Sequence, residues 1–168
     1  MEQQEIINYL QIVNDELCKL NLKGEICLYG GAVMCLVFNA RPSTKDVDAI
    51  FEPARTIKEI ARKIAGEKGL PDDWLNDGVK GFVVEHSRQV FLALSNLTVF
   101  TAEPEYLLAM KCLAGRIDTI DNNDVRFLIK KLNLVSSGQV FSILQKYYPR
   151  NQIRPATQYF IEEIFNSL

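Results

Sequence analysis

A chain of 168 residues is long enough for one domain, or for a catalytic core with a small helical appendage, and buries roughly 70% of its unfolded surface. Charged residues make up 24% and apolar residues 48% of the sequence, which excludes a disordered or fibrous protein. The formal net charge of -2 argues against a broad basic face for duplex DNA or RNA. A local basic patch remains compatible with this charge.

The cysteines and the N-terminal residues indicate a cytoplasmic protein. Four cysteines lie in apolar segments without a C-x-x-C spacing, and we expect reduced, buried thiols rather than disulfides or zinc ligands: Cys18, Cys27, Cys35 and Cys112. The first ten residues are acidic and polar, whereas a signal peptide needs a basic start and an apolar run. No segment approaches the roughly 18 consecutive apolar residues of a membrane span, so we expect no membrane association.

Helices and strands alternate in the first two thirds of the chain. Apolar residues at steps of four and three predict an amphipathic helix over 3–20. A short apolar run predicts a buried strand over 26–29, which two glycines end, and residues 32–38 resume as a helix. A second core strand is predicted over 47–51, followed by a helix from Pro53 to about residue 68.

The remaining third of the chain is predominantly helical. Before it, β-branched and aromatic residues predict three short strands, over 81–85, 89–94 and 97–101. Four helices follow, with Asn123 or Asp124 capping the second, over 104–116, 123–132, 137–147 and 155–167. This order predicts an α/β or α+β fold with a mixed sheet flanked by helices. We expect a core over 1–103 and a helical part over 104–168 packed on it.

Two aspartates stand two residues apart at the start of the second core strand. Asp46 and Asp48 leave the same face of a strand, with Cβ atoms roughly 7 Å apart. Two hard oxygen donors on one rigid edge suit Mg²⁺, which bridges phosphate oxygens. On spacing alone, the sequence favours a solvent-facing acid for Asp48 and a cap or turn residue for Asp46.

The glycine pair adds a second element to this candidate site. Gly30 and Gly31 lie between a strand and a helix, where glycines let the backbone approach a phosphate closely. An ordinary tight turn is the alternative. The spacing matches neither G-x-G-x-x-G nor the Walker loop, so a dinucleotide site and a P-loop are both excluded.

Together these motifs resemble the polymerase-β-type nucleotidyltransferase superfamily. The residues that carry the resemblance are the glycine pair of the run 28–31 and the Asp-x-Asp of the run 41–50, Arg-Pro-Ser-Thr-Lys-Asp-Val-Asp-Ala-Ile. The runs 70–77 and 104–111 are similar to a little-characterised bacterial branch near the abortive-infection toxin–antitoxin nucleotidyltransferases. The resemblance extends over most of the chain and implies a nucleotidyltransferase-like fold.

The resemblance implies transfer of a nucleotidyl group from an NTP to a hydroxyl on RNA, protein or a small molecule. Asp46 and Asp48 would bind Mg²⁺, or Mn²⁺ in its place, and both are implied catalytic residues. The nucleotide-binding residues implied are Gly30, Gly31, Ser43 and Thr44. A toxin–antitoxin partner chain is also implied.

The superfamily's third carboxylate normally lies on a later core strand, but the runs 91–94 and 97–100 carry no acid. Glu85 is the best substitute as the catalytic base or third ligand. Loss of that acid would weaken deprotonation of the acceptor by roughly 10²- to 10⁴-fold. A catalytically degenerate binding module, or an antitoxin-type interaction module, is therefore the alternative function.

Three further residues have two interpretations each. Lys111 lies in an otherwise apolar helix, where it would bind phosphate or pair with Asp118 or Asp121. Trp74 follows a turn and is more typical of a core anchor than of a base-stacking ring. His86 is the single histidine and has no nucleophile pattern around it, which favours a structural role.

Overall fold

The chain forms a mixed α/β structure in two compact units. A computed structural model describes residues 1–114 and 120–168, except for the side chains of residues 120 and 121. The first unit comprises Met1–Val83 and Arg88–Ala102 and holds the sheet. The second comprises Val84–Ser87 and Glu103–Leu168 and holds the C-terminal helices. The short segment Val84–Ser87 thus belongs with helices that follow it in the sequence.

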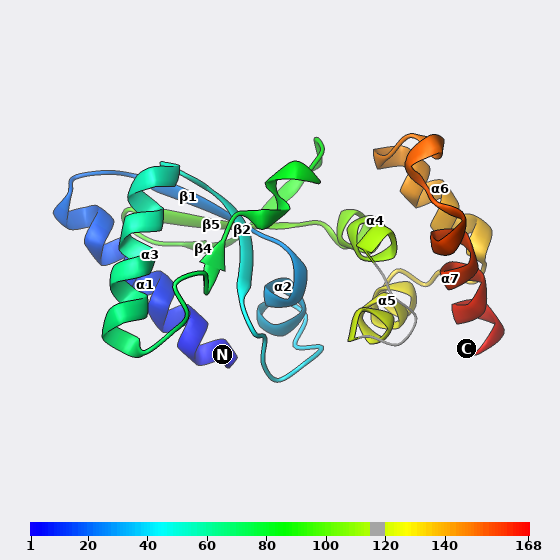
Figure 1. Cartoon of the computed structure of the whole chain (residues 1–168), viewed down its shortest axis with the longest axis horizontal. Coiled ribbons are helices and arrows are strands. Elements are labelled where there is room, and N and C mark those ends of the chain that lie inside the picture. Colours follow the sequence, from blue (N-terminus) through cyan, green and yellow to red (C-terminus); the bar gives the residue numbers. More distant parts are fainter. Residues whose placement is uncertain (115–119) are drawn as a thin grey trace. The chain divides into compact units, whose positions relative to one another are not determined.

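The first unit is built around a five-stranded open sheet (Figure 1). Its elements in chain order are α1 (Gln3–Lys19), β1 (Gly24–Leu28), α2 (Gly30–Leu36), β2 (Val47–Glu52), α3 (Ala54–Lys68), β3 (Leu75–Asn76), the 3₁₀ turn η1 (Gly78–Gly81), β4 (Arg88–Ala93) and β5 (Leu97–Ala102). The strand order is β3-β2-β1-β5-β4. β1 runs parallel to β5 and antiparallel to β2, so the sheet is mixed. The predicted mixed sheet flanked by helices is confirmed.

One face of the sheet is almost completely buried. Its side chains are at most 3% exposed and come from the three central strands: Ile26, Leu28, Ala49, Phe51, Leu97 and Val99. α1 and α3 supply the apolar cover, and they lie side by side in Figure 1. Burying a side chain of this size stabilises the fold by roughly 1.5–3 kcal/mol. The opposite face is only half-buried at several positions, including Asp48 and Phe100.

Trp74 is a core anchor, as its sequence context favoured. Its side chain is 1% exposed, and its indole Nε1 donates a hydrogen bond to the Ala61 carbonyl oxygen at 2.9 Å. Its ring meets the edge of the Tyr9 ring at a centroid distance of 5.3 Å. The ring therefore ties the approach to β3 to both α1 and α3.

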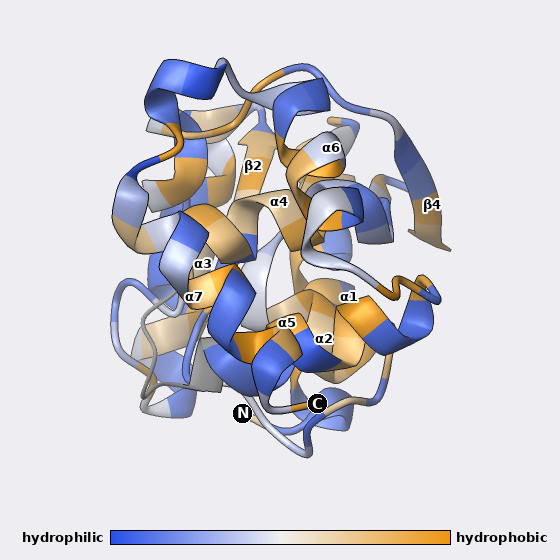
Figure 2. Cartoon of the chain, turned by 90° about the vertical axis from the view of Figure 1, so that its right-hand side faces the viewer, coloured by the Kyte–Doolittle hydropathy of each residue, from blue (hydrophilic) through white to orange (hydrophobic). Residues whose placement is uncertain are grey.

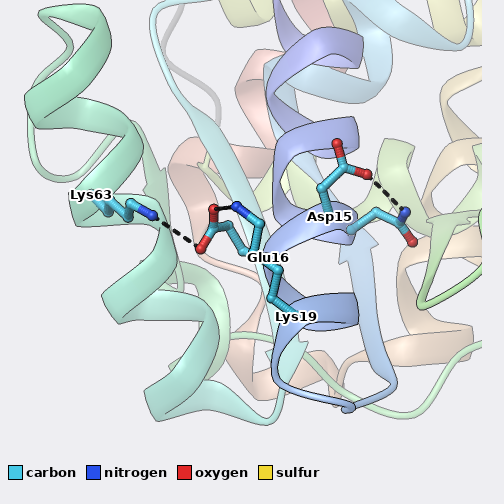
Figure 3. Close-up of polar contacts among 5 residues, drawn as sticks. Asp15, Glu16, Lys19 and Lys63 are labelled. Atoms are coloured by element: carbon cyan, nitrogen blue, oxygen red, sulfur yellow. Dashed lines mark hydrogen bonds and ion pairs between the residues drawn. The ribbon is translucent and has the colours of Figure 1, made fainter.

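Charged side chains link α1 to α3 at the surface (Figure 3). Glu16 accepts from Lys19 at 2.9 Å within α1 and from Lys63 of α3 at 3.1 Å. These hydrogen bonds hold the pKa of the Glu16 carboxyl below its ordinary value, with the Lys19 bond contributing most. The carboxylate is therefore favoured in the folded chain.

The second unit packs helices around α4. Its elements are α4 (Pro104–Ala114), α5 (Ile120–Lys131), α6 (Ser137–Tyr147), the 3₁₀ turn η2 (Arg150–Gln152) and α7 (Pro155–Asn166). α4 contacts α5, α6 and α7, and Figure 2 shows both hydrophobic and hydrophilic segments along α5 and α7. Tyr106 of α4 holds the segment Val84–Ser87. Its hydroxyl oxygen accepts from the Val84 amide at 3.0 Å, and its ring stacks on His86 at 4.1 Å.

Several sequence-based expectations are wrong in detail. Residues 81–85 form no strand. The run 76–81 contains Asn, Asp and two glycines, which favour a turn. It forms η1, which backbone hydrogen bonds from Lys80 to Asp77 and from Phe82 to Val79 close. The two-residue strand β3 carries too few residues for a periodic signal. Asn123 and Asp124 lie inside α5 and do not cap it.

One expectation about burial is also wrong. Cys18 is exposed: it follows the buried Leu17, and consecutive side chains of an α-helix point about 100° apart. The other three cysteines are buried, as expected.

Candidate functional site

The end of β1 and the beginning of β2 bring Gly30 against Asp48. The two strands are antiparallel, and the Tyr29 amide donates to the Asp48 carbonyl oxygen at 2.9 Å. Gly30 has φ +59°, a conformation that favours glycine. A Cβ built on Gly30 would lie only 2.8 Å from Oδ2 of Asp48. The Asp48 carboxylate therefore occupies the space that a side chain at residue 30 would need.

Gly31 lies against two side chains of the loop before β2. A Cβ at this position would overlap Nη2 of Arg41 and lie 2.7 Å from Oγ1 of Thr44. Thr44 is 7% exposed, and its hydroxyl donates to the Asp46 carbonyl oxygen at 3.1 Å. The glycine pair is thus bordered by a carboxylate at one residue and by a guanidinium and a hydroxyl at the next.

The two aspartates alternate with buried neighbours. Asp46 and Asp48 are half-buried, whereas Val47 and Ala49 are fully buried. Because side chains alternate along a strand, this pattern favours the same face for both carboxylates. We predict that their oxygens lie within about 5 Å of each other, as a shared metal site requires.

The loop that carries Ser43 and Thr44 is paired with the N-terminal residues. The Thr44 amide donates to the Met1 carbonyl oxygen at 2.9 Å, and the Met1 amino group donates to the Thr44 carbonyl oxygen at 2.7 Å. Ser43 forms an antiparallel bridge with Glu2 and is exposed. Of the two hydroxyls expected to position phosphates, that of Thr44 therefore lies at the glycine pair.

The strand register shows what flanks Asp48 across the sheet. On one side, Asp48 is opposite Asn76 of β3. On the other side it is opposite Tyr29, the residue after β1, because Leu28 of β1 pairs with Ala49 in the antiparallel register. The same row continues through Ala102 of β5 to Arg88 of β4. None of these strand residues is acidic. Within β2 itself, the other acid on the face of Asp48 is Glu52, four residues or about 13 Å away along the strand.

Glu85 and Lys111 belong to the second unit, whereas the glycine pair and both aspartates belong to the first. Glu85 is exposed and lies on the segment Val84–Ser87, outside any strand. Nζ of Lys111 pairs with Oδ2 of Asp124 at 2.9 Å, with the two side chains 10% and 5% exposed. The expected partners Asp118 and Asp121 lie outside the side chains that the structure describes.

Sequence reasoning missed two residues at this site. Arg41 was part of the motif but received no role, because a loop residue carries no periodic signal. Asn76 was missed with β3; its Oδ1 accepts from the Gly78 amide at 3.0 Å and its Nδ2 donates to the Asp73 carbonyl oxygen at 3.3 Å. Asn76 therefore fixes the turn into η1, which packs against β2.

Asp46 and Asp48 would supply only part of the coordination that Mg²⁺ needs. Within residues 1–114 and 120–168, no three His, Cys, Asp or Glu side chains are grouped so that they could hold a metal ion by themselves. Mg²⁺ is commonly held by one or two carboxylates, with substrate phosphates and water completing its octahedron. Asp46 and Asp48 supply that number of carboxylates.

Comparison with known proteins leaves the family unassigned. No protein-family model matches the sequence, and no curated protein or solved structure matches it. Among the described helices, none has both the length and the apolar composition needed to cross a membrane.

Proposed function

We propose that this chain is a magnesium-dependent nucleotidyltransferase of the polymerase-β type. The observation that carries the proposal is the approach of the Asp48 carboxylate to Gly30. A Cβ built on Gly30 would lie only 2.8 Å from Oδ2 of Asp48. This approach links the glycine pair and the Asp-x-Asp, the two motifs of the resemblance, at one place. The order of strand, glycine pair, helix and carboxylate strand also supports it.

In the proposed reaction, an acceptor hydroxyl oxygen attacks the α-phosphorus of an NTP. A new phosphorus–oxygen bond forms, the bond to pyrophosphate breaks, and the hydroxyl proton passes to a base. Asp46 and Asp48 would hold the metal, and Gly30 leaves the space that the Asp48 carboxylate occupies. When bound, Mg²⁺, or Mn²⁺ in its place, supplies positive charge against the charge that develops on the phosphate oxygens.

A second candidate function is a nucleotide-binding module without turnover, such as an antitoxin-type partner. The observations that favour it are the acid-free row beside Asp48 and the exposed position of Glu85 outside the strands. A missing base would weaken proton removal by roughly 10²- to 10⁴-fold and leave binding at Asp46 and Asp48 largely intact. Both candidates therefore share the binding site and differ in transfer.

The binding site is tested with Asp48→Asn. We expect this variant to fold and to lose the Mg²⁺-dependent rise in melting temperature that an NTP causes in the wild type, because a metal ligand is removed. Asp72→Asn is the matched control, since Asp72 is an exposed acid of the same unit and the charge change is the same. A nucleotide-induced shift as large in Asp48→Asn as in Asp72→Asn would refute the metal site.

Transfer is tested with each labelled NTP, Mg²⁺ or Mn²⁺, and a cell extract that supplies RNA, protein and small-molecule acceptors. Label that moves to an acceptor with wild type and not with Asp48→Asn supports the enzyme. Glu85→Gln then tests the base, with an expected loss of roughly 10²- to 10⁴-fold in transfer and little change in nucleotide affinity. Equal transfer by Glu85→Gln and wild type would rule out Glu85.

Nucleotide binding without label transfer would support the second candidate. Lys111 is tested in the same binding assay, because its proposed phosphate contact competes with its ion pair to Asp124.

A further inference from the structure

We propose that Arg41 is the residue that binds the phosphates of the substrate directly, independently of the metal. The inference rests on the proposed nucleotide site and deepens it. The observation behind it is the overlap between the Arg41 guanidinium and the space where a Gly31 side chain would be. Residue 31 admits no Cβ without displacing this cation, so the glycine is explained by the presence of Arg41.

The guanidinium lies at the same turn as the carboxylate of Asp48. Asp48 occupies the space over Gly30 and Arg41 occupies the space over Gly31, which are consecutive residues. A cation beside a pair of metal-binding carboxylates gives the site two separate means of holding a triphosphate. Asp46 and Asp48 would hold a metal that supplies positive charge to some phosphate oxygens, and the Arg41 guanidinium offers a planar fork of N–H donors to others.

The loop around Arg41 is fixed on both sides. Before it, the Ala40 amide donates to the Met34 carbonyl oxygen of α2 at 2.8 Å. After it, Thr44 is hydrogen-bonded to Met1 in both directions. Nε of Arg41 is itself buried. A loop whose backbone is held in this way loses little conformational entropy when its arginine binds a ligand, which favours a binding role.

Arginine is suited to this position in a way that lysine is not. A guanidinium donates two parallel hydrogen bonds to one phosphate group, whereas an ammonium acts as a point charge. Hydrogen bonds that involve a charged group are the stronger kind, and loss of the bidentate geometry is expected to weaken phosphate binding about 10- to 100-fold. Arg41→Lys preserves the charge and removes this geometry.

The test measures binding of inorganic tripolyphosphate by calorimetry, with EDTA present to exclude divalent metals. We expect the wild type to bind it and Arg41→Lys to bind it about 10- to 100-fold more weakly. Asp48→Asn is expected to bind at least as tightly as wild type, because a repelling carboxylate is gone. Arg55→Lys is the matched control, since Arg55 is 93% exposed on α3, and its affinity should equal that of wild type.

A second variant moves Arg41 without changing it. Gly31→Ala adds a methyl group at a position in α2 where it overlaps the guanidinium of Arg41 and lies 2.7 Å from Oγ1 of Thr44, so both side chains must shift. We expect it to bind tripolyphosphate about 10-fold more weakly or worse, and circular dichroism measured in parallel checks that it is folded. This variant keeps the inference testable if Arg41→Lys fails to fold.

The outcomes separate this inference from the proposed function. Wild-type affinity for tripolyphosphate in both Arg41→Lys and Gly31→Ala would overturn the role of Arg41, while Mg²⁺-dependent NTP binding would continue to support the nucleotidyltransferase site. No binding of tripolyphosphate by the wild type would also overturn it. Arg41-dependent binding of tripolyphosphate without any Mg²⁺-dependent NTP binding would instead overturn the proposed function.

Discussion

The ion pair between Lys111 and Asp124 gives the most quantitative prediction. It joins α4 to α5 at 2.9 Å, and the two side chains are only 10% and 5% exposed. Removing one partner of such a pair takes from a buried charge the ion pair that stabilises it, which costs up to about 3–5 kcal/mol. We therefore expect Lys111→Met and Asp124→Leu each to lower the free energy of unfolding by this amount. The double variant should recover most of the loss, because it buries no charge.

The assay is urea unfolding followed by two signals. The single tryptophan, Trp74, lies in the first unit, so its fluorescence reports on that unit, whereas far-ultraviolet circular dichroism also detects the helices of the second. With a slope of about 2 kcal/mol per molar urea, a loss of about 4 kcal/mol lowers the midpoint by about 2 M. The change should appear in the circular dichroism of the single variants and be much smaller in the double variant.

Two results would refute this reasoning. A cost below about 1 kcal/mol for Lys111→Met would show that the pair behaves as a surface ion pair. A double variant as unstable as the sum of the two single variants would show that the side chains act independently. Lys111→Met also tests the phosphate role. If Lys111 binds phosphate, its loss should weaken NTP affinity in protein that is still folded.

Three further predictions concern the first unit and the cysteines. Gly30→Ala should destabilise the chain by about 1–2 kcal/mol and abolish the Mg-NTP melting shift, because φ is +59° and Asp48 fills the space; Gly66→Ala, in the open part of α3, should raise the melting temperature instead. The lowered pKa of Glu16 stabilises the wild type above pH 4.5, and this stability is lost as the pH falls through that pKa. Glu16→Gln should lack it, so the melting temperatures of the two proteins should differ near neutral pH and converge in acid. Ellman's reagent should label Cys18 in the folded chain and the three other thiols only after unfolding, since burial raises the pKa of each of those three; rapid labelling of more than one thiol would contradict the burial.

The long elements could be predicted because each carries a periodic apolar pattern of its own. α1, β2, α3 and α6 begin and end within two residues of the predicted bounds. The region 75–87 could not be predicted in the same way. Its valines and phenylalanine favour a strand locally, but Asn76, Asp77 and two glycines close a turn that packs on β2. A local propensity was overridden by turn chemistry and tertiary contact.

The candidate site shows the same division. The glycine pair and the Asp-x-Asp could each be recognised from sequence, because a strand-to-helix turn and a two-residue spacing have local geometry. The approach of Asp48 to Gly30 depends on the pairing of β1 with β2. The neighbours of Asp48 could not, since Asn76 and Tyr29 are set by strand order and register. Glu85 was assigned to a strand that does not form, so its expected place beside the sheet had no structural basis.

The role of the glycine pair changes once the side chains around it are known. From sequence, two glycines after a strand indicate a backbone that a phosphate approaches closely. In the structure, the space over Gly30 holds the Asp48 carboxylate and the space over Gly31 holds the Arg41 guanidinium. The glycines therefore bring an anion and a cation of the chain to consecutive residues. A substrate that carries phosphate and metal together has groups complementary to both charges, and the Arg41 and Asp48 variants separate these two contributions.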